Sequence, residues 1–222
     1  MKKQLDSTTI ISAVIISALL FIGGVVVGYS INREKLSAIE SDMSDVTRAV
    51  ENFQLQFLFF DVLGENAACP LLIATVADIN KASYEIGSRL TAQDSPDQIQ
   101  DYTEYVNLKR EYSRVLVSYW LLANKLKETC KSNANTIIYF YSKDCLACDD
   151  QGFILSYLKS KEEEDLLIFA LDAELDEPSL KALKEYYNVK EFPTLIINGA
   201  VYGGFQSEQE LRNALGLKNN GG

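Results

Sequence analysis

A long uncharged stretch near the N-terminus most strongly limits how this chain folds. Residues Ser7 to Asn32 contain no charged side chain and are rich in Ile, Val and Leu. About 20 apolar residues are enough to cross a bilayer as a helix, and Ile10 to Tyr29 supply them. The stretch therefore predicts a single-pass transmembrane helix, within an N-terminal anchor formed by residues 1–34.

A cleavable signal peptide is the competing interpretation of this stretch. The apolar part of such a peptide is about 7–15 residues long and ends in an Ala-x-Ala-like site. The run in this chain is longer and offers no such site, which favours a retained anchor. Basic residues flank both sides, so charge does not give the orientation. A short head before the anchor favours a cytoplasmic N-terminus and extracytoplasmic C-terminal domains.

The composition excludes several kinds of site. The chain has 222 residues, a formal net charge of −10 and no histidine. An acidic chain lacks the basic face that binds phosphate backbones, so we expect no nucleic-acid partner. Without histidine there is no hydrolase with a histidine base, no histidine-containing zinc site and no histidine-ligated haem. We expect neither a cofactor nor a metal.

Residues 35–132 are predicted to form an all-α region of about three helices. In the first helix, apolar residues recur at alternating spacings of three and four from Leu36 to Phe60, which is typical of a helical seam. A second helix is predicted to start at Pro70, and a third repeats the seam from Tyr105 to Leu126. An antiparallel bundle buries these seams. A homodimer through the first helix, acting as a stalk, is the alternative, because a seam does not identify its partner.

Two cysteines mark the ends of predicted helices. Cys69 precedes the second helix and Cys130 follows the third, so antiparallel helices bring both cysteines toward the same end of the bundle. A structural disulfide between them is one interpretation, and it requires an oxidising compartment. Two unrelated buried thiols are the other interpretation.

From residue 133 onward the pattern changes to alternating strands and helices. Apolar runs of strand length, rich in β-branched and aromatic residues, lie at 136–141, 166–171 and 192–197, with helical segments between them. Asn198-Gly199 predicts a tight hairpin into a fourth strand, and a closing helix is predicted from Glu208 to Leu217. The order β-α-β-α-β-β-α predicts an α/β domain of residues 133–222, with helices on the faces of a sheet.

The motif Cys145-Leu-Ala-Cys148 falls where the first of these strands gives way to a helix. Unpaired backbone N–H groups and the helix dipole favour negative charge at such a position. Because the pKa of a free cysteine is about 8.5, we expect the pKa of Cys145 to fall and its thiolate to act as the nucleophile. Cys148, one turn later, is placed to resolve a mixed disulfide by attacking the Cys145 sulfur.

Together these features resemble the thioredoxin superfamily. The resemblance covers Thr136 to about Leu217, and it rests on a CxxC at a strand-to-helix turn, Phe192-Pro-Thr opening the third strand, the hairpin and a glycine pair before the last helix. It implies a thioredoxin-like fold in which Pro193 is a cis proline packed against the CxxC and shares in catalysis. It also implies that Phe192 and Thr194, beside this proline, contact the substrate.

The sequence departs from the thioredoxin pattern in two places. Tyr139 stands six residues before the first cysteine, where thioredoxin carries a buried acid, and Asp144 replaces the tryptophan just before the CxxC. The first strand of the family is not evident, so the third predicted helix is a candidate for the place of the family's first helix. Both departures leave the direction of electron flow open.

The resulting prediction is a membrane-anchored thiol–disulfide oxidoreductase that acts on the disulfides or thiols of other proteins. Its expected partners are these protein substrates, the membrane and a redox partner protein. A non-catalytic scaffold, whose helical region recruits a partner, is the first alternative. The second is an all-cysteine zinc site formed by Cys69, Cys130, Cys145 and Cys148.

Overall fold

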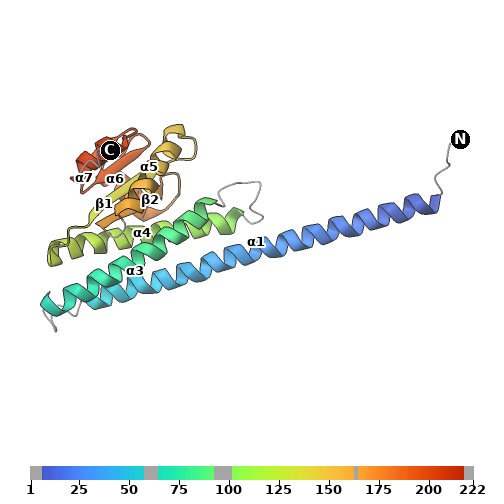
Figure 1. Cartoon of the computed structure of the whole chain (residues 1–222), viewed down its shortest axis with the longest axis horizontal. Coiled ribbons are helices and arrows are strands. Elements are labelled where there is room, and N and C mark those ends of the chain that lie inside the picture. The colour runs from blue at the N-terminus through green and yellow to red at the C-terminus, as the bar shows by residue number, and fades with distance from the viewer. Residues whose placement is uncertain (1–6, 58–64, 93–101, 163–164, 218–222) are drawn as a thin grey trace.

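The structure is a computed structural model that describes residues 7–57, 65–92, 102–162 and 165–217 (Figure 1). Three long helices come first: α1 (Ser7–Phe57), α3 (Glu65–Ala92) and α4 (Tyr102–Cys130). Figure 1 shows α3 folded back along the second half of α1, while the first half of α1 projects away from the rest of the molecule. A small α/β domain packs on α4.

The helix α1 is continuous but has two parts of different character. Its segment Ile11–Gly28 has a mean hydropathy of 2.6 and is long and apolar enough to cross a membrane, a description that a signal sequence near the N-terminus also meets. Large apolar side chains of this segment are exposed, with Leu20 at 72% and Phe21 at 74%. The described chain therefore has one N-terminal helix with the length and composition of a membrane span.

The second half of α1 belongs to a bundle with α3 and α4. The predicted seam residues that the structure describes on α1 and α3 are all buried: Ile39, Met43, Val46, Val50, Leu72, Val76, Ile79, Ile86 and Leu90. The structure does not describe the side chains of the remaining seam residues of α1. The predicted end of this helix, near residue 64, also lies outside the described residues. The three seams meet within one chain, as the antiparallel bundle requires.

Three tyrosines of α4 show how this helix lies on α3. Their hydroxyls donate to backbone carbonyls of α3 at 2.8, 2.6 and 3.0 Å, which pairs Tyr105 with Leu90, Tyr112 with Ser83 and Tyr119 with Val76. Each step of seven residues forward along α4 is a step of seven residues back along α3. The two helices are therefore antiparallel and in constant register over this length.

Three predicted boundaries are wrong, and one of them is the end of the closing helix, which lies at Leu215 and not at Leu217. The helix α3 begins at Glu65, and Pro70 lies inside it. Proline lacks an N–H, but so close to the helix start the loss is confined to one backbone hydrogen bond. The third strand begins at Thr194 and not at Phe192, because Pro193 has no N–H to donate to the ladder.

The α/β domain has the predicted order of elements. It consists of β1 (Asn135–Tyr141), α5 (Leu146–Glu162), β2 (Leu166–Asp172), α6 (Pro178–Tyr186), β3 (Thr194–Ile197), β4 (Ala200–Gly203) and α7 (Glu208–Leu215). The strands lie in the order β2-β1-β3-β4. β1 is parallel to β2, whereas β3 is antiparallel to both β1 and β4. The predicted order β-α-β-α-β-β-α is thus confirmed, and the four strands form a small mixed sheet.

Helices cover both faces of this sheet. One apolar cluster contains Ile138 and Phe140 of β1 with side chains of α4 and α6, and a second contains Ile137 of β1 with side chains of α5 and α7. The first cluster also includes the buried seams of the bundle. One apolar core therefore runs from the bundle into the sheet, across the boundary predicted between residues 132 and 133, and that boundary stays a prediction.

The helix α4 belongs to the bundle and to the α/β domain at once. Tyr119 donates its hydroxyl to α3, while its ring meets Phe169 of β2 edge-on, with 5.1 Å between the ring centroids. The next residue of α4, Trp120, lies edge-on to Tyr187, just after α6. The third predicted helix thus covers a face of the sheet as well as packing on α3.

Candidate active site

Cys145 and Cys148 form a disulfide at the start of α5, with Cα atoms 5.3 Å apart. Cys145 directly precedes Leu146, the first residue of the helix, and is half-buried, whereas Cys148 lies in the first turn and is only 4% exposed. The N–H of Cys148 donates to the carbonyl of Cys145 at 3.0 Å. The two residues therefore differ in exposure, and Cys145 is the more accessible of the pair.

The surface around the pair is exposed and chemically mixed. Leu146, between the two cysteines, exposes 90% of its surface. Asp144, Asp149 and Asp150 are exposed beside it, as is Lys143. The tip of the motif therefore presents an exposed apolar side chain among charged ones.

Tyr139 lies beneath this turn, on the α5 side of the sheet. It is buried, and its hydroxyl donates to the carbonyl of Cys148 at 2.6 Å. Burial raises the pKa of Tyr139 well above its usual range, and nearby Tyr141 and Asp149 act in the same direction. Tyr139 is therefore a neutral hydrogen-bond donor that holds the first turn of α5 against β1, and it supplies no carboxylate that accepts a proton from Cys148.

The segment before β3 carries the other predicted site residues. The Phe192–Pro193 peptide bond is cis, and the buried Pro193 accepts a hydrogen bond from Gly204 at 2.8 Å. Phe192 packs against the same apolar cluster as both cysteines of the motif. Thr194 is 2% exposed, and its hydroxyl donates to the carbonyl of Glu191 at 2.7 Å. The catalytic role of Pro193 and the substrate contacts of Phe192 and Thr194 stay predictions.

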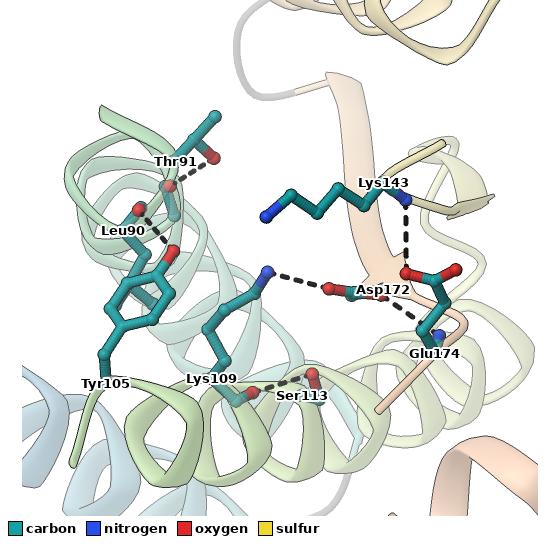
Figure 2. Close-up of polar contacts among 9 residues, drawn as sticks. Leu90, Thr91, Tyr105, Lys109, Ser113, Lys143, Asp172 and Glu174 are labelled. Atoms are coloured by element: carbon teal, nitrogen blue, oxygen red, sulfur yellow. Dashed lines mark hydrogen bonds and ion pairs between the residues drawn. The ribbon is translucent and has the colours of Figure 1, made fainter. Parts of the chain in front are cut away.

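A buried ion pair supports the loop that leads into the motif (Figure 2). Lys109 Nζ of α4 lies 2.7 Å from Asp172 Oδ2 at the end of β2, and both side chains are 11% exposed. The other oxygen of this carboxylate accepts the N–H of Glu174 at 3.0 Å. Glu174 Oε2 in turn accepts the N–H of Lys143 at 3.4 Å. These contacts connect the bundle to the backbone two residues before Cys145.

Lys109 is held in its charged form by its neighbours. Burial by itself lowers the pKa of Lys109, but Tyr141 and the hydrogen bond and charge of Asp172 outweigh burial and raise it. Its ammonium also lies over the rings of Tyr105 and Tyr141, 5.7 and 5.9 Å from their centroids. The charge of Lys109 therefore compensates the buried carboxylate, as a buried ion needs.

Three polar residues near the motif are buried or nearly so and carry no motif that predicts a site. Besides Lys109 and Asp172, Gln151 of α5 is fully buried, and its side-chain oxygen accepts the N–H of Gln206 at 2.7 Å, which joins α5 to the segment before α7. The signal for Asp172 was a carboxylate at the end of an apolar strand, since a buried carboxylate needs a partner. No comparable signal marks Lys109 or Gln151.

The second pair of cysteines is also bonded. The disulfide Cys69–Cys130 joins the start of α3 to the end of α4, with Cα atoms 5.6 Å apart. Cys130 precedes β1, whereas the CxxC follows it. The four cysteines therefore form two disulfides at opposite ends of β1 and do not meet in one site. Among the described residues, no group of three or more Cys, Asp or Glu is arranged to hold a metal ion.

Comparison with known proteins gives matches among solved structures alone. No family model and no curated protein matches the chain. Thioredoxin-2, described as a component of the malaria parasite protein secretion machinery, is 24% identical over 38% of this chain and 82% of its own, with a TM-score of 0.34. Chloroplastic thioredoxin z is 15% identical over 42% of this chain and 86% of its own, also with a TM-score of 0.34. The germline-specific thioredoxin Deadhead of Drosophila melanogaster is 20% identical over 44% of this chain and 91% of its own, with the same TM-score of 0.34.

Proposed function

We propose that this chain is a membrane-anchored thiol–disulfide oxidoreductase with a thioredoxin-like domain. The observation that carries the proposal is the Cys145–Cys148 disulfide, in which a half-buried cysteine directly before a helix is bonded to a buried cysteine in its first turn. This asymmetry suits a pair in which one thiol attacks the substrate and the other resolves the product.

The exchange proceeds in two steps that balance in atoms and electrons. The Cys145 thiolate attacks one sulfur of a substrate disulfide, so that this bond breaks and the other substrate sulfur leaves as a thiolate and takes up a proton. Cys148 then loses its proton and attacks the Cys145 sulfur, which releases the second substrate thiol and forms the Cys145–Cys148 disulfide. Two electrons pass to the substrate, and the reverse sequence oxidises a substrate dithiol.

The start of α5 stabilises the attacking thiolate. Unpaired N–H groups and the helix dipole favour a negative charge on Cys145, whereas the exposed Asp149 and Asp150 oppose it. In the proposed complex, the substrate backbone lies along Phe192, Pro193 and Thr194. The balance of these charges sets the reduction potential, and with it the direction in which electrons flow.

The proposed location follows from two further features. The exposed apolar surface of Ile11–Gly28 is stabilised by lipid, because burying apolar surface contributes about 25 cal/mol per Å². The Cys69–Cys130 disulfide belongs in an oxidising compartment. Together they support a retained anchor with the α/β domain on the extracytoplasmic side.

Trapping the mixed disulfide tests the proposed chemistry. The Cys148→Ser variant lacks the resolving thiol, so the full chain is expected to form a stable, reducible adduct with glutathione disulfide through Cys145. The matched Cys145→Ser variant keeps only the buried thiol and is expected to react more than tenfold more slowly. Equal rates for the two variants, or no adduct on Cys145, would overturn the proposal.

Extraction tests the anchor separately. The full chain is expected to stay with lipid vesicles after an alkaline carbonate wash, while a chain that begins at Leu36 is released. Release of both chains would contradict the membrane assignment and leave the chemistry of the CxxC untouched.

A further inference from the structure

We infer that the CxxC site faces the membrane, at a height about 20 Å along α1 beyond the end of the apolar segment, and exchanges disulfides with a membrane-anchored partner whose cysteines lie close to the bilayer. This inference rests on the proposed function for the anchor and for the exchange chemistry. It adds the direction in which the site faces and the class of partner that reaches it.

The end of α3 marks the membrane side of the bundle. Arg89, near the end of α3, pairs with Asp42 of α1. Asp42 lies fourteen residues beyond Gly28, where the apolar segment ends. At about 1.5 Å per helical residue, this ion pair is about 21 Å from the end of that segment. The start of α3 lies farther from the membrane, since α3 folds back along α1 (Figure 1).

The helix α4 begins at this membrane side and runs away from it. Tyr105, in its first turn, donates its hydroxyl to Leu90, the neighbour of Arg89 in the sequence. At its other end, Cys130 is bonded to Cys69 at the start of α3. The direction of α4 is therefore set at both ends.

The strand β1 then returns toward the membrane. At the far end of α4, Lys127 donates to Asn198 Oδ1 at 3.1 Å, and the same oxygen accepts the N–H of Thr136 at the start of β1 at 3.1 Å. At the near end, Lys109 binds Asp172, whose partner in the sheet is Tyr141, the last residue of β1. The strand is thus antiparallel to α4, and its carboxyl end points toward the bilayer.

Cys145 follows Tyr141 by four residues and so lies at this membrane-side end of the domain. Figure 2 shows the side chain of Lys143, in the loop before the motif, pointing toward Leu90 and Thr91 near the end of α3. Figure 1 shows the same arrangement at lower magnification: α5 lies on the side of the domain that faces the projecting half of α1.

The height of the site limits what can reach it. A folded domain of about 100 residues has a radius of gyration of about 13 Å and is therefore more than about 30 Å across. Such a domain does not fit between the site and a bilayer about 20 Å away. A loop or short segment that emerges from a membrane helix does fit. The partner is therefore a membrane protein that presents a dithiol or disulfide just outside the bilayer, and the two-electron exchange with it is the one described above.

Reaction with a lipid-tethered probe tests this inference. The full-length Cys148→Ser variant is placed in phosphatidylcholine vesicles that contain a phospholipid with a pyridyl disulfide on a spacer of about 20 Å. The Cys145 thiolate attacks the probe and releases pyridine-2-thione, which absorbs light. A soluble pyridyl disulfide measures the accessible thiol in the same vesicles, and each result is expressed as the ratio of the tethered to the soluble rate.

A matched control carries its thiol at the other end of the domain. Ala200 is exposed and follows the hairpin residue Asn198, which Lys127 contacts at the far end of α4. The control is Ala200→Cys combined with Cys145→Ser and Cys148→Ser. We expect the rate ratio at Cys145 to exceed that of the control at least tenfold. Equal ratios would overturn the membrane-facing site and point to soluble partners.

A longer stalk provides the second arm. Eighteen helical residues inserted between Ser37 and Ala38 add five full turns and about 27 Å, so the site keeps its direction and is lifted. The rate with the tethered probe is expected to fall more than tenfold while the rate with the soluble probe is unchanged. An unchanged tethered rate would overturn the inference. Failure of Cys145 to react even with the soluble probe would instead overturn the proposed function.

Discussion

Lys109 Nζ lies 2.7 Å from Asp172 Oδ2 and thereby joins the helical bundle to the end of β2, beneath the loop that carries the CxxC. Both side chains are largely buried, and the carboxylate also accepts the N–H of Glu174, whose own side chain accepts the N–H of Lys143. The position of the motif relative to the bundle therefore depends on a charged pair that has little access to water.

Removing the lysine is expected to leave a buried carboxylate without compensation. Lys109→Met should lower the free energy of unfolding by about 3 kcal/mol, and adding Asp172→Asn should recover part of this loss because no buried charge remains. Denaturant unfolding of the full chain in detergent measures both. The control is Lys125→Met on the same helix, whose exposed ion pair with Glu128 at 4.0 Å is worth less than about 1 kcal/mol. Equal effects of the two lysine substitutions would contradict the conclusion that Lys109 compensates a buried carboxylate.

A second ion pair predicts how stability depends on pH. The hydrogen bond from Arg114 holds the pKa of Glu177 below its ordinary value of 4.5, against the opposing effect of burial, and the charge of Arg114 and hydrogen bonds with Ser179 add to the lowering. A carboxyl group whose pKa is lower in the folded than in the unfolded chain stabilises the fold. This stabilisation is complete above the pKa of the unfolded chain and is lost as the pH falls through the pKa of the folded chain.

Glu177→Gln is therefore expected to destabilise the chain by about 1 kcal/mol at pH 7, since Arg114 is mostly exposed. The difference in the free energy of unfolding between this variant and the wild type should shrink as the pH falls below about 4.5. Unfolding curves collected across this range measure the difference. A difference that stays constant down to pH 3 would show that ionised Glu177 is not what stabilises the fold.

The Cys69–Cys130 disulfide closes a loop with a sequence separation of 61. The loss of chain entropy in the unfolded state predicts a stabilisation of about 4 kcal/mol for a loop of this size. Replacing both cysteines by serine should lower the unfolding midpoint accordingly, while the rate at which Cys145 reacts with a soluble disulfide stays within about twofold. Peptide mapping without reduction identifies the bond in the natural chain. Free thiols at both positions in that map would contradict the structure.

Tyr139→Phe tests the neutral hydroxyl beneath the motif. Loss of its hydrogen bond to Cys148 should lower the free energy of unfolding by about 1 kcal/mol. Because Tyr139 carries no charge in this environment, the apparent pKa of Cys145, read from the pH profile of its alkylation, should change by less than about half a unit. A larger shift would assign Tyr139 a part in proton transfer.

The main elements of this fold are predictable because their residues repeat regularly. Alternating spacings of three and four identify the buried faces of α1, α3 and α4, and short apolar runs identify the strands. The Asn198-Gly199 pair identifies the hairpin between β3 and β4. In each case the signal is local, so one segment of the chain contains it.

The ion pair and the double role of α4 are not local. Lys109 and Asp172 are 63 residues apart, and a lysine beside a helical seam is indistinguishable from a solvated one until the partner element is placed. The same holds for Leu116 and Val117, which lie off the predicted seam and are buried because the sheet packs on a second side of α4. The orientation of the CxxC relative to the anchor depends on these contacts, and so only the assembled fold reveals it.

A redox titration of the Cys145/Cys148 couple tests the central claim most directly. The full chain is equilibrated with glutathione mixtures of defined potential, and its free thiols are then trapped and counted. We expect a single reversible two-electron transition with a midpoint between about −270 mV, the value for a reductant such as thioredoxin, and about −120 mV, the value for a strong oxidant. If the two cysteines form no disulfide at any potential, the chain is not an oxidoreductase.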